Sequence, residues 1–223
     1  MSSSKSSKSF LVSTISDNPM SIFSNLSRFN SSVISGIHFD VMDGIFVPRL
    51  GLYPELLAEI HKHTLIPIEV HCMLKNSFPY IKLFSESGAK RVIFHVETSE
   101  RLPFLISEAK SLNLEVGIAI NPDTPIPALL PYLQIVDFIL AMAVYPGGKK
   151  MPLLPKTYER ILEIDSLLDS VSLDIPISVD GGVTFENISE LNNCGVSRFI
   201  CGSGTVFSPN NSVAVNLEKL RTL

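Results

Sequence analysis

Residues 36–44 read Gly-Ile-His-Phe-Asp-Val-Met-Asp-Gly, and this stretch decides the fold. Apolar side chains alternate in it with His38 and Asp40, so a strand would turn the apolar groups to one face and the polar pair to the other. Burying an imidazole or a carboxylate without a partner costs on the order of several kcal/mol, so a polar strand end needs a reason. The stretch predicts a buried strand whose polar end belongs to a functional site.

Apolar runs of the same kind recur along the whole chain. They are rich in Val, Ile and Phe and are bounded by Gly, Pro or Asn, as buried parallel strands are. The predicted strands cover residues 10–15, 36–41, 66–73, 91–96, 114–120, 136–144, 175–179 and 198–201. Between them, apolar residues recur every three or four positions, which predicts helices over residues 54–63, 77–87, 102–112, 156–168 and 186–193.

This alternation predicts an α/β fold, a closed (β/α)8 TIM barrel in which each strand is followed by a helix. A doubly wound open sheet is the alternative, because it is built from the same units. No linker or shift in composition divides the chain, so we expect a single barrel domain over residues 10–223. Residues 1–9 are serine-rich, carry Lys5 and Lys8 and lack the apolar core of a signal peptide, which predicts a disordered or frayed tail.

The composition excludes several classes of protein. The 223 residues are 45% hydrophobic and 18% charged, which is not the composition of a disordered chain. A formal net charge of −4 does not favour nucleic acid or an anionic membrane as a partner. The longest unbroken apolar run, residues 138–145, is far shorter than the ~20 residues that span a bilayer. Cys72, Cys194 and Cys201 are odd in number and have no C-x-x-C spacing, which predicts a reducing, cytoplasmic location.

Polar residues end three of the predicted strands, and in a barrel the chemistry lies at these C-terminal ends. His38 and Asp40 end the second strand, His71 lies near the end of the third, and Asp180 follows the seventh. If they point into the barrel, two imidazoles and two carboxylates converge, a ligand set that suits Zn²⁺, Mn²⁺ or Fe²⁺. The alternative is that each residue is a satisfied interior polar group. Asp43, which precedes a glycine, has the sequence of a turn instead.

Glycines follow the seventh and eighth predicted strands, where this fold commonly binds phosphate. Gly181 and Gly182 follow one strand, and Gly202 and Ser203 follow the other. Without a side chain, backbone N–H groups can approach phosphate oxygens closely. The loop at residues 145–150, which ends in two lysines, follows the sixth strand and is placed to close over the same site. We therefore expect a phosphate group at this end of the barrel.

Taken together, these residues resemble the motifs of the ribulose-phosphate 3-epimerase family. The run from His38 to Gly44, continued by Phe46-Val47-Pro48, is similar to the most specific signature of that family. Further similar motifs follow in the same order at residues 70–73, 121–125, 179–183 and 202–203. The resemblance covers residues 11–207 and implies a TIM-barrel isomerase of the pentose phosphate pathway. Such an enzyme inverts carbon 3 of D-ribulose 5-phosphate and gives D-xylulose 5-phosphate.

The resemblance also implies a role for individual residues. One divalent metal ion (Zn, Mn, Fe or Co) is implied, with the ligands His38, Asp40, His71 and Asp180. Asp40 and Asp180 are implied as the two acid–base residues, which move a proton on opposite faces of a metal-stabilised enediolate. The implied substrate-binding residues are Ser13, Met42, His71, Met73, Met142, Gly147, Gly148, Gly181, Gly182, Gly202 and Ser203.

Two loops depart from the family pattern and leave the substrate open. Where the family has N-P-G-F-G-G-Q, residues 145–151 read Tyr-Pro-Gly-Gly-Lys-Lys-Met, so Lys149 or Lys150 could place an ammonium over the phosphate. Residues 49–53 lack an asparagine and a glycine of the family pattern. The alternatives are a 3-epimerase for another ketose phosphate, such as allulose 6-phosphate, or a non-catalytic phosphate-binding barrel. The sequence leaves the oligomeric state open, including a homo-oligomer.

Overall fold

The computed structural model of the chain describes residues 7–18, 20–98, 101–148 and 150–223. Within this part of the chain, parallel strands pair in sequence order and close into one barrel. The strands are β1 (Ser9–Ser13), β2 (Ile34–Met42), β3 (Ile68–Met73), β4 (Arg91–His95), β5 (Glu115–Ile120), β6 (Phe138–Met142), β7 (Ile177–Asp180) and β8 (Val196–Cys201). The last strand, β8, pairs with β1, which closes the barrel and excludes the open sheet.

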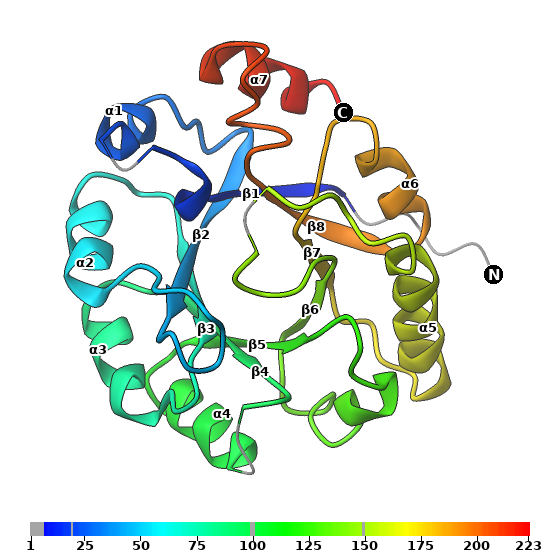
Figure 1. The fold of residues 1–223 in the computed structure, drawn as a ribbon. Helices are drawn as coiled ribbons and strands as arrows, with labels where there is room; N and C mark the ends of the chain where they lie inside the picture. The colour runs from blue at the N-terminus through cyan, green and yellow to red at the C-terminus, as the bar shows by residue number, and fades with distance from the viewer. Residues whose placement is uncertain (1–6, 19, 99–100, 149) are drawn as a thin grey trace.

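Helices surround the barrel in chain order, as the view along its axis shows (Figure 1). The α-helices are α1 (Ile22–Leu26), α2 (Pro54–Lys62), α3 (Ile81–Glu86), α4 (Leu102–Ser111), α5 (Thr157–Ser170), α6 (Ile188–Asn193) and α7 (Val213–Arg221). Short 3-10 helices are η1 (Thr14–Ser16), η2 (Phe78–Tyr80) and η3 (Ile126–Leu129). The predicted (β/α)8 TIM barrel is thereby confirmed. None of these helices, within the described residues, is long and apolar enough to cross a membrane.

The elements differ from the prediction at several points along the chain. Residues 14–15 were predicted as strand but form η1, and no residue range was predicted for the helices expected after the first and last strands, α1 and α7. The connection after β5 carries η3 where an α-helix was expected, since Pro125, Pro127 and Pro131 lack the N–H groups that a continuous helix would need. The predicted tail, residues 1–9, lies mostly outside the described residues, and β1 begins within it at Ser9.

Apolar side chains fill both faces of the strands. Outward-facing residues such as Phe39, Phe94 and Phe199 are fully buried between the barrel and the helices. A second set fills the barrel interior: Leu11, Ile93, Ala119, Phe138, Leu140, Met142 and Ile200. The interior is therefore packed, as in other barrels of this kind, and polar chemistry is confined to particular positions along the strands.

Candidate active site

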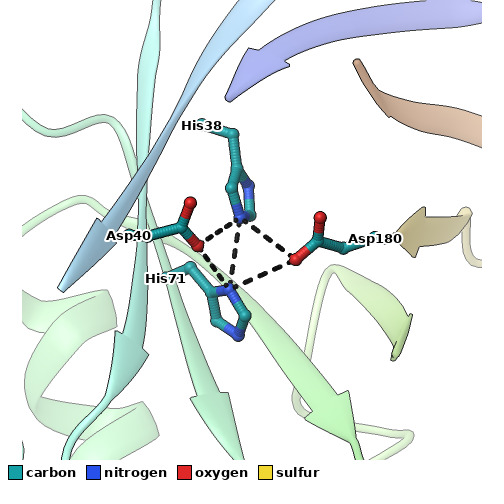
Figure 2. A group of neighbouring side chains, drawn as sticks. All are labelled: His38, Asp40, His71 and Asp180. Atoms are coloured by element: carbon teal, nitrogen blue, oxygen red, sulfur yellow. Dashed lines mark hydrogen bonds and ion pairs between the residues drawn. The ribbon is translucent and has the colours of Figure 1, made fainter. Parts of the chain in front are cut away.

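The register between strands brings the predicted polar residues together near the C-terminal ends of the strands. Asp40 on β2 is the register partner of His71 on β3, and Met142 on β6 is the partner of Asp180 on β7. His38 lies two residues before Asp40, so both side chains point to the same side of the strand. Figure 2 shows the four polar side chains converging from β2, β3 and β7.

The four side chains form a group that we call the quartet: His38, Asp40, His71 and Asp180. Nε2 of His38 and Nδ1 of His71 lie 3.2 Å apart. Oδ1 of Asp40 is 3.2 Å from the first nitrogen and 3.1 Å from the second, and Oδ2 of Asp180 is 3.8 Å from each. These dimensions are those of one ligand cage.

The quartet fits a divalent metal ion in distance and in charge. Metal–ligand bonds of about 2.0–2.2 Å in a tetrahedron place the ligand atoms roughly 3.4 Å apart. The separations between each histidine nitrogen and each carboxylate oxygen are 3.1–3.8 Å, and all four ligand atoms lie within 4.8 Å of one another. Carboxylate oxygens offset the charge of a divalent cation, while neutral imidazoles supply nitrogen lone pairs. The donor set of two nitrogens and two oxygens suits Zn²⁺, Mn²⁺, Fe²⁺ or Co²⁺.

Electrostatics within the quartet also favour a cation. Burial lowers the pKa of His38, but the charge of Asp40 and hydrogen bonds with Asp40 and Glu69 outweigh it and raise the pKa well above its ordinary value. Burial raises the pKa of Asp40, but His38 and His71 outweigh this effect and hold the pKa far below its usual range. Burial raises the pKa of Asp180, and the charge of Asp40 adds to the shift against the attraction of His38. The field that attracts a proton to His38 attracts a metal cation to the same place.

Each histidine of the quartet has a carboxylate behind it, the fully buried Glu69 or the partly exposed Glu97, a feature that the sequence analysis missed. Nδ1 of His38 is 2.7 Å from Oε1 of Glu69. Nε2 of His71 is 2.8 Å from Nε2 of His95, whose Nδ1 is 3.1 Å from Oε2 of Glu97. Burial, opposed by Glu97, lowers the pKa of His95 to about 4. The signal was present in the sequence, because Glu69 and His95 alternate with apolar residues as His38 and Asp40 do.

A cavity opens above the quartet and contains most of the predicted substrate-binding residues. Its lining includes Asp40, Asp180, Ser13, Met42, Met73, Met142, Gly147, Gly148, Gly181, Gly182, Gly202 and Ser203. Ser13 donates from Oγ to Oδ2 of Asp40, 3.2 Å away. His71, predicted to bind substrate as well as metal, is fully buried and lies outside this lining. Its contact with the site is through the quartet alone.

The expected phosphate end of the cavity is built from left-handed glycines. Gly181 and Gly182 have φ values of 100° and 66°, which side-chain-bearing residues rarely adopt. A Cβ on Gly181 would lie 2.3 Å from the Val144 side chain, and one on Gly182 would lie 2.2 Å from the backbone nitrogen of Leu153. Only glycine therefore lets these backbone segments pack so closely beside the cavity.

The two loops that depart from the family pattern also reach the cavity. The segment between β6 and α5, yellow-green in Figure 1, crosses in front of the barrel opening in that view. Lys150 from this segment and Arg49 from the loop after β2 both contribute to the lining. Lys149, the other lysine of the prediction, lies outside the described residues. The lining of the cavity therefore carries two cationic side chains.

Asp43 has the turn role that its sequence predicted. Its Oδ1 accepts hydrogen bonds from the backbone N–H groups of Ile45 and Phe46, each at 2.8 Å. Its Oδ2 accepts from the N–H of Lys75 at 2.7 Å, which ties the loop after β2 to the end of β3. Asp43 therefore fixes a loop beside the site.

Comparison with known proteins identifies the family. A profile of the Ribulose-phosphate 3 epimerase family matches residues 10–207. The chain belongs to the ribulose-phosphate 3-epimerase family. It is similar to the ribulose-phosphate 3-epimerase of Buchnera aphidicola, with 36% identity over 186 residues, 83% of this chain and 81% of the relative. The ribulose-phosphate 3-epimerase of Escherichia coli is 33% identical, over 78% of this chain and 78% of its own. That of Aquifex aeolicus is 31% identical, over 84% of this chain and 83% of its own.

Solved structures agree on the fold. The tryptophan synthase alpha-subunit of Pyrococcus furiosus superposes with a TM-score of 0.67 at 13% identity, covering 98% of this chain and 95% of that one. At this identity the likeness concerns the barrel alone. Membership of the ribulose-phosphate 3-epimerase family confirms the prediction that the protein is an isomerase of the epimerase type. The quartet supplies such an enzyme with residues that could hold a metal ion.

Proposed function

We propose that the protein interconverts D-ribulose 5-phosphate and D-xylulose 5-phosphate by inverting carbon 3. The observation that carries the proposal is the pair Asp40 and Asp180, two carboxylates from β2 and β7 that line one cavity beside the same two imidazoles. Inversion beside a carbonyl needs one group to remove a proton and a second to return one on the opposite face. Carboxylates from separate strands can reach the two faces of one planar intermediate.

The proton transfers balance with these two residues. One aspartate accepts the proton of carbon 3 as the C–H bond breaks, and the electron pair forms a double bond to carbon 2 while the carbonyl oxygen gains negative charge. The other aspartate gives its proton to the opposite face of carbon 3, and the carbonyl forms again. Ser13, which donates to Oδ2 of Asp40, orients that carboxylate. A divalent ion held by the quartet would supply positive charge beside the enediolate oxygens.

The rest of the cavity supports a small phosphorylated sugar. Met42, Met73 and Met142 are almost fully buried and give the reacting carbon an apolar, polarizable wall. We assign the phosphate to the glycines after β7 and to Gly202 and Ser203 after β8, which line the cavity at the strand ends where this fold commonly binds phosphate. The free thiols Cys72, Cys194 and Cys201 support a cytoplasmic location.

A second candidate substrate is a longer ketose phosphate such as allulose 6-phosphate. The observation in its favour is that Arg49 and Lys150 line the cavity, where the family pattern has neutral residues. The residues of the quartet are all present, which favours catalysis over a non-catalytic phosphate-binding barrel.

Hydrogen exchange tests both the reaction and the substrate. Purified protein is incubated in deuterated water with D-ribulose 5-phosphate, and in parallel with D-allulose 6-phosphate, and carbon 3 is followed by NMR. We expect deuterium at carbon 3 together with the signals of D-xylulose 5-phosphate. Faster exchange into D-allulose 6-phosphate than into D-ribulose 5-phosphate would identify the longer ketose phosphate as the substrate. If neither ketose phosphate exchanges hydrogen, the protein is not an epimerase for them.

A further inference from the structure

We propose that Glu69 and the pair His95–Glu97 are positioning residues that fix opposite tautomers of the two quartet histidines. His38 carries its proton on Nδ1 and presents the bare Nε2 to the quartet, whereas His71 carries its proton on Nε2 and presents the bare Nδ1. The inference rests on the proposed metal-binding role of the quartet. It adds a function for the buried Glu69 and His95 and for the half-buried Glu97, none of which lines the cavity.

The first step concerns His38 and Glu69. Both side chains are completely buried, and Oε1 of Glu69 is 2.7 Å from Nδ1 of His38. Oε2 of the same carboxylate pairs with the guanidinium of Arg198, which is stacked 4.1 Å from the centre of the Phe138 ring. An arginine stays charged and donates only, so Glu69 is held as an acceptor on both oxygens. Nδ1 of His38 must then be the donor, so in the neutral form that a metal ligand requires, Nε2 is the nitrogen without a proton.

The second step concerns His71 and runs through another ring. Oε1 of Glu97 accepts from the backbone N–H of Asn121 at 2.8 Å and from the hydroxyl of Thr124. Its Oε2 faces Nδ1 of His95 at 3.1 Å, so that nitrogen donates. Nε2 of a neutral His95 is then an acceptor, and it lies 2.8 Å from Nε2 of His71. His71 therefore donates from Nε2 and turns an unprotonated Nδ1 toward the quartet.

Together the two chains of hydrogen bonds direct lone pairs to one point. Nε2 of His38 and Nδ1 of His71 lie 3.2 Å apart, and neither nitrogen has a proton to give the other. Oδ1 of Asp40 lies about as close to both, so the convergent atoms share no donor in this protonation state. A cation is the group that satisfies all of them at once. Carboxylates behind metal-bound histidines are known to set ring orientation and basicity.

Isosteric substitutions can reverse the donor–acceptor direction of each series of hydrogen bonds, because the neighbouring donors stay in place. In Glu69→Gln, Arg198 needs the amide oxygen, so the amide nitrogen faces His38 Nδ1 and forces the proton onto Nε2. In Glu97→Gln, the Asn121 N–H and the Thr124 hydroxyl need the oxygen, so the amide nitrogen faces His95. The proton of His95 then moves to Nε2, and that of His71 moves to Nδ1. Both variants place a proton where a metal ligand should be bare.

Zn²⁺ alone is the probe, and two readouts are used. The first is the tautomer of each ring in Zn²⁺-loaded, ¹⁵N-labelled protein, read from two-bond ¹H–¹⁵N correlations, with the exposed His61 and His63 as references. The second is Zn²⁺ affinity by competition with a chelator. We expect opposite tautomers for His38 and His71 in the wild type, and a Zn²⁺ affinity about 10–100-fold lower in each variant.

Glu115→Gln is the matched control, because Glu115 pairs with Arg91 on the neighbouring strand and contacts no quartet histidine. Its Zn²⁺ affinity should equal that of the wild type. Identical tautomers at His38 and His71, or wild-type Zn²⁺ affinity in both glutamine variants, would overturn the proposal. A wild-type spectrum that shows a proton on Nε2 of His38 or on Nδ1 of His71 would overturn the proposal even if a variant fails to fold. Because Zn²⁺ is the only probe, opposite tautomers in a protein that does not epimerise would support this positioning role and count against the proposed function.

Discussion

Asp40 and His71 are register partners on the adjacent strands β2 and β3, and Oδ1 of the aspartate lies 3.1 Å from Nδ1 of the histidine. Their contact depends on strand pairing rather than on closeness in sequence. A slip of one residue between the two strands would turn one of these side chains out of the barrel. The apolar residues on the outer face, such as Phe39 and Val70, are fully buried and oppose that slip. Core packing thus holds the register on which the site depends.

Replacing either aspartate should separate proton exchange from inversion. In Asp40→Asn or Asp180→Asn one carboxylate remains, which can still remove and return a proton on its own face. We expect epimerisation to fall by about 10²–10⁴-fold in each variant. Each should still exchange the carbon 3 hydrogen of one epimer, and a different epimer in each variant. Isotope exchange into D-ribulose 5-phosphate and D-xylulose 5-phosphate, measured separately by NMR, provides the check.

Metal content and circular dichroism serve as controls for these variants, because both aspartates belong to the quartet. A variant that retains its metal and its fold but loses exchange on one face supports the assignment. If either variant kept more than about a tenth of wild-type turnover, less than a tenfold effect, its aspartate would have no acid–base role.

Removal of the metal should abolish activity without unfolding the barrel. Exhaustive chelation removes the positive charge beside the enediolate, and added Zn²⁺, Mn²⁺, Fe²⁺ or Co²⁺ should restore turnover. His38→Ala and His71→Ala should lower metal affinity for the same reason. The fold should persist, since a core of this size does not depend on one ion. Full turnover in metal-free protein, verified by elemental analysis, is the outcome that contradicts this prediction.

The sequence predicted the barrel and the quartet because both follow from local rules. The alternation of His38 and Asp40 with apolar residues fixes their common face, and strand ends fix the height of His71 and Asp180. The roles of Glu69 and His95 were beyond these rules. Which ring nitrogen a carboxylate reaches depends on strand pairing and on the orientation of the rings in the closed barrel. The sequence of a single strand predicts neither of these.

The helical connections show the same limit. The prediction placed α2, α4 and α5 to within a few residues, because their apolar spacing is long and regular. It missed α1, which has five residues, and expected a helix where prolines leave only η3. Of the two residues on β3 that were predicted to bind substrate, Met73 lines the cavity, whereas His71 is fully buried and reaches the site through the quartet.

Stability should depend on pH through Asp43. Burial raises the pKa of this carboxyl, but the N–H groups of Lys75, Phe46 and Ile45 outweigh burial and lower it. A folded-state pKa below the unfolded one stabilises the fold above the unfolded pKa, near 4, and the stabilisation is lost as the pH falls through the folded value. Asp43→Ala should therefore lower the free energy of unfolding by about 1–2 kcal/mol at pH 7 and by less at pH 3.

Urea unfolding of the wild type and of Asp43→Ala at the two pH values measures this difference. Glu163→Ala is the control, because it removes an exposed carboxylate of α5 rather than one of the loop after β2. It should change the free energy of unfolding only slightly. The free energy of unfolding of Asp43→Asn should lie between those of the wild type and Asp43→Ala. The amide retains one acceptor oxygen but offers no acceptor to the third N–H group. An equal loss at pH 7 and pH 3 in Asp43→Ala would show that the charge of Asp43 contributes nothing.

Lys150 should contribute to phosphate binding. It lines the cavity together with the glycines after β7, and no described carboxylate forms an ion pair with its ammonium. Its φ of 52° is left-handed, so replacement by alanine would retain backbone strain, whereas Lys150→Gly removes the charge and keeps the loop conformation accessible. If the ammonium contacts the phosphate, this variant should bind a ketose phosphate more weakly by about 1.5–3 kcal/mol, the scale of a charged hydrogen bond. The KM for D-ribulose 5-phosphate should rise accordingly.

Two comparisons separate phosphate binding from a general effect of charge. Lys90→Ala removes an exposed lysine just before β4, far from the cavity lining, and should leave KM unchanged. Lys150→Arg keeps a cation in the loop and should restore most of the affinity that Lys150→Gly loses. Activity on the unphosphorylated ketose, which has no group for the ammonium to contact, should be the same in all three variants and the wild type. An unchanged KM in Lys150→Gly would mean that Lys150 is a solvated surface lysine. Equal kcat/KM values for the phosphorylated and the free sugar would mean that the glycines after β7 and β8 hold no phosphate.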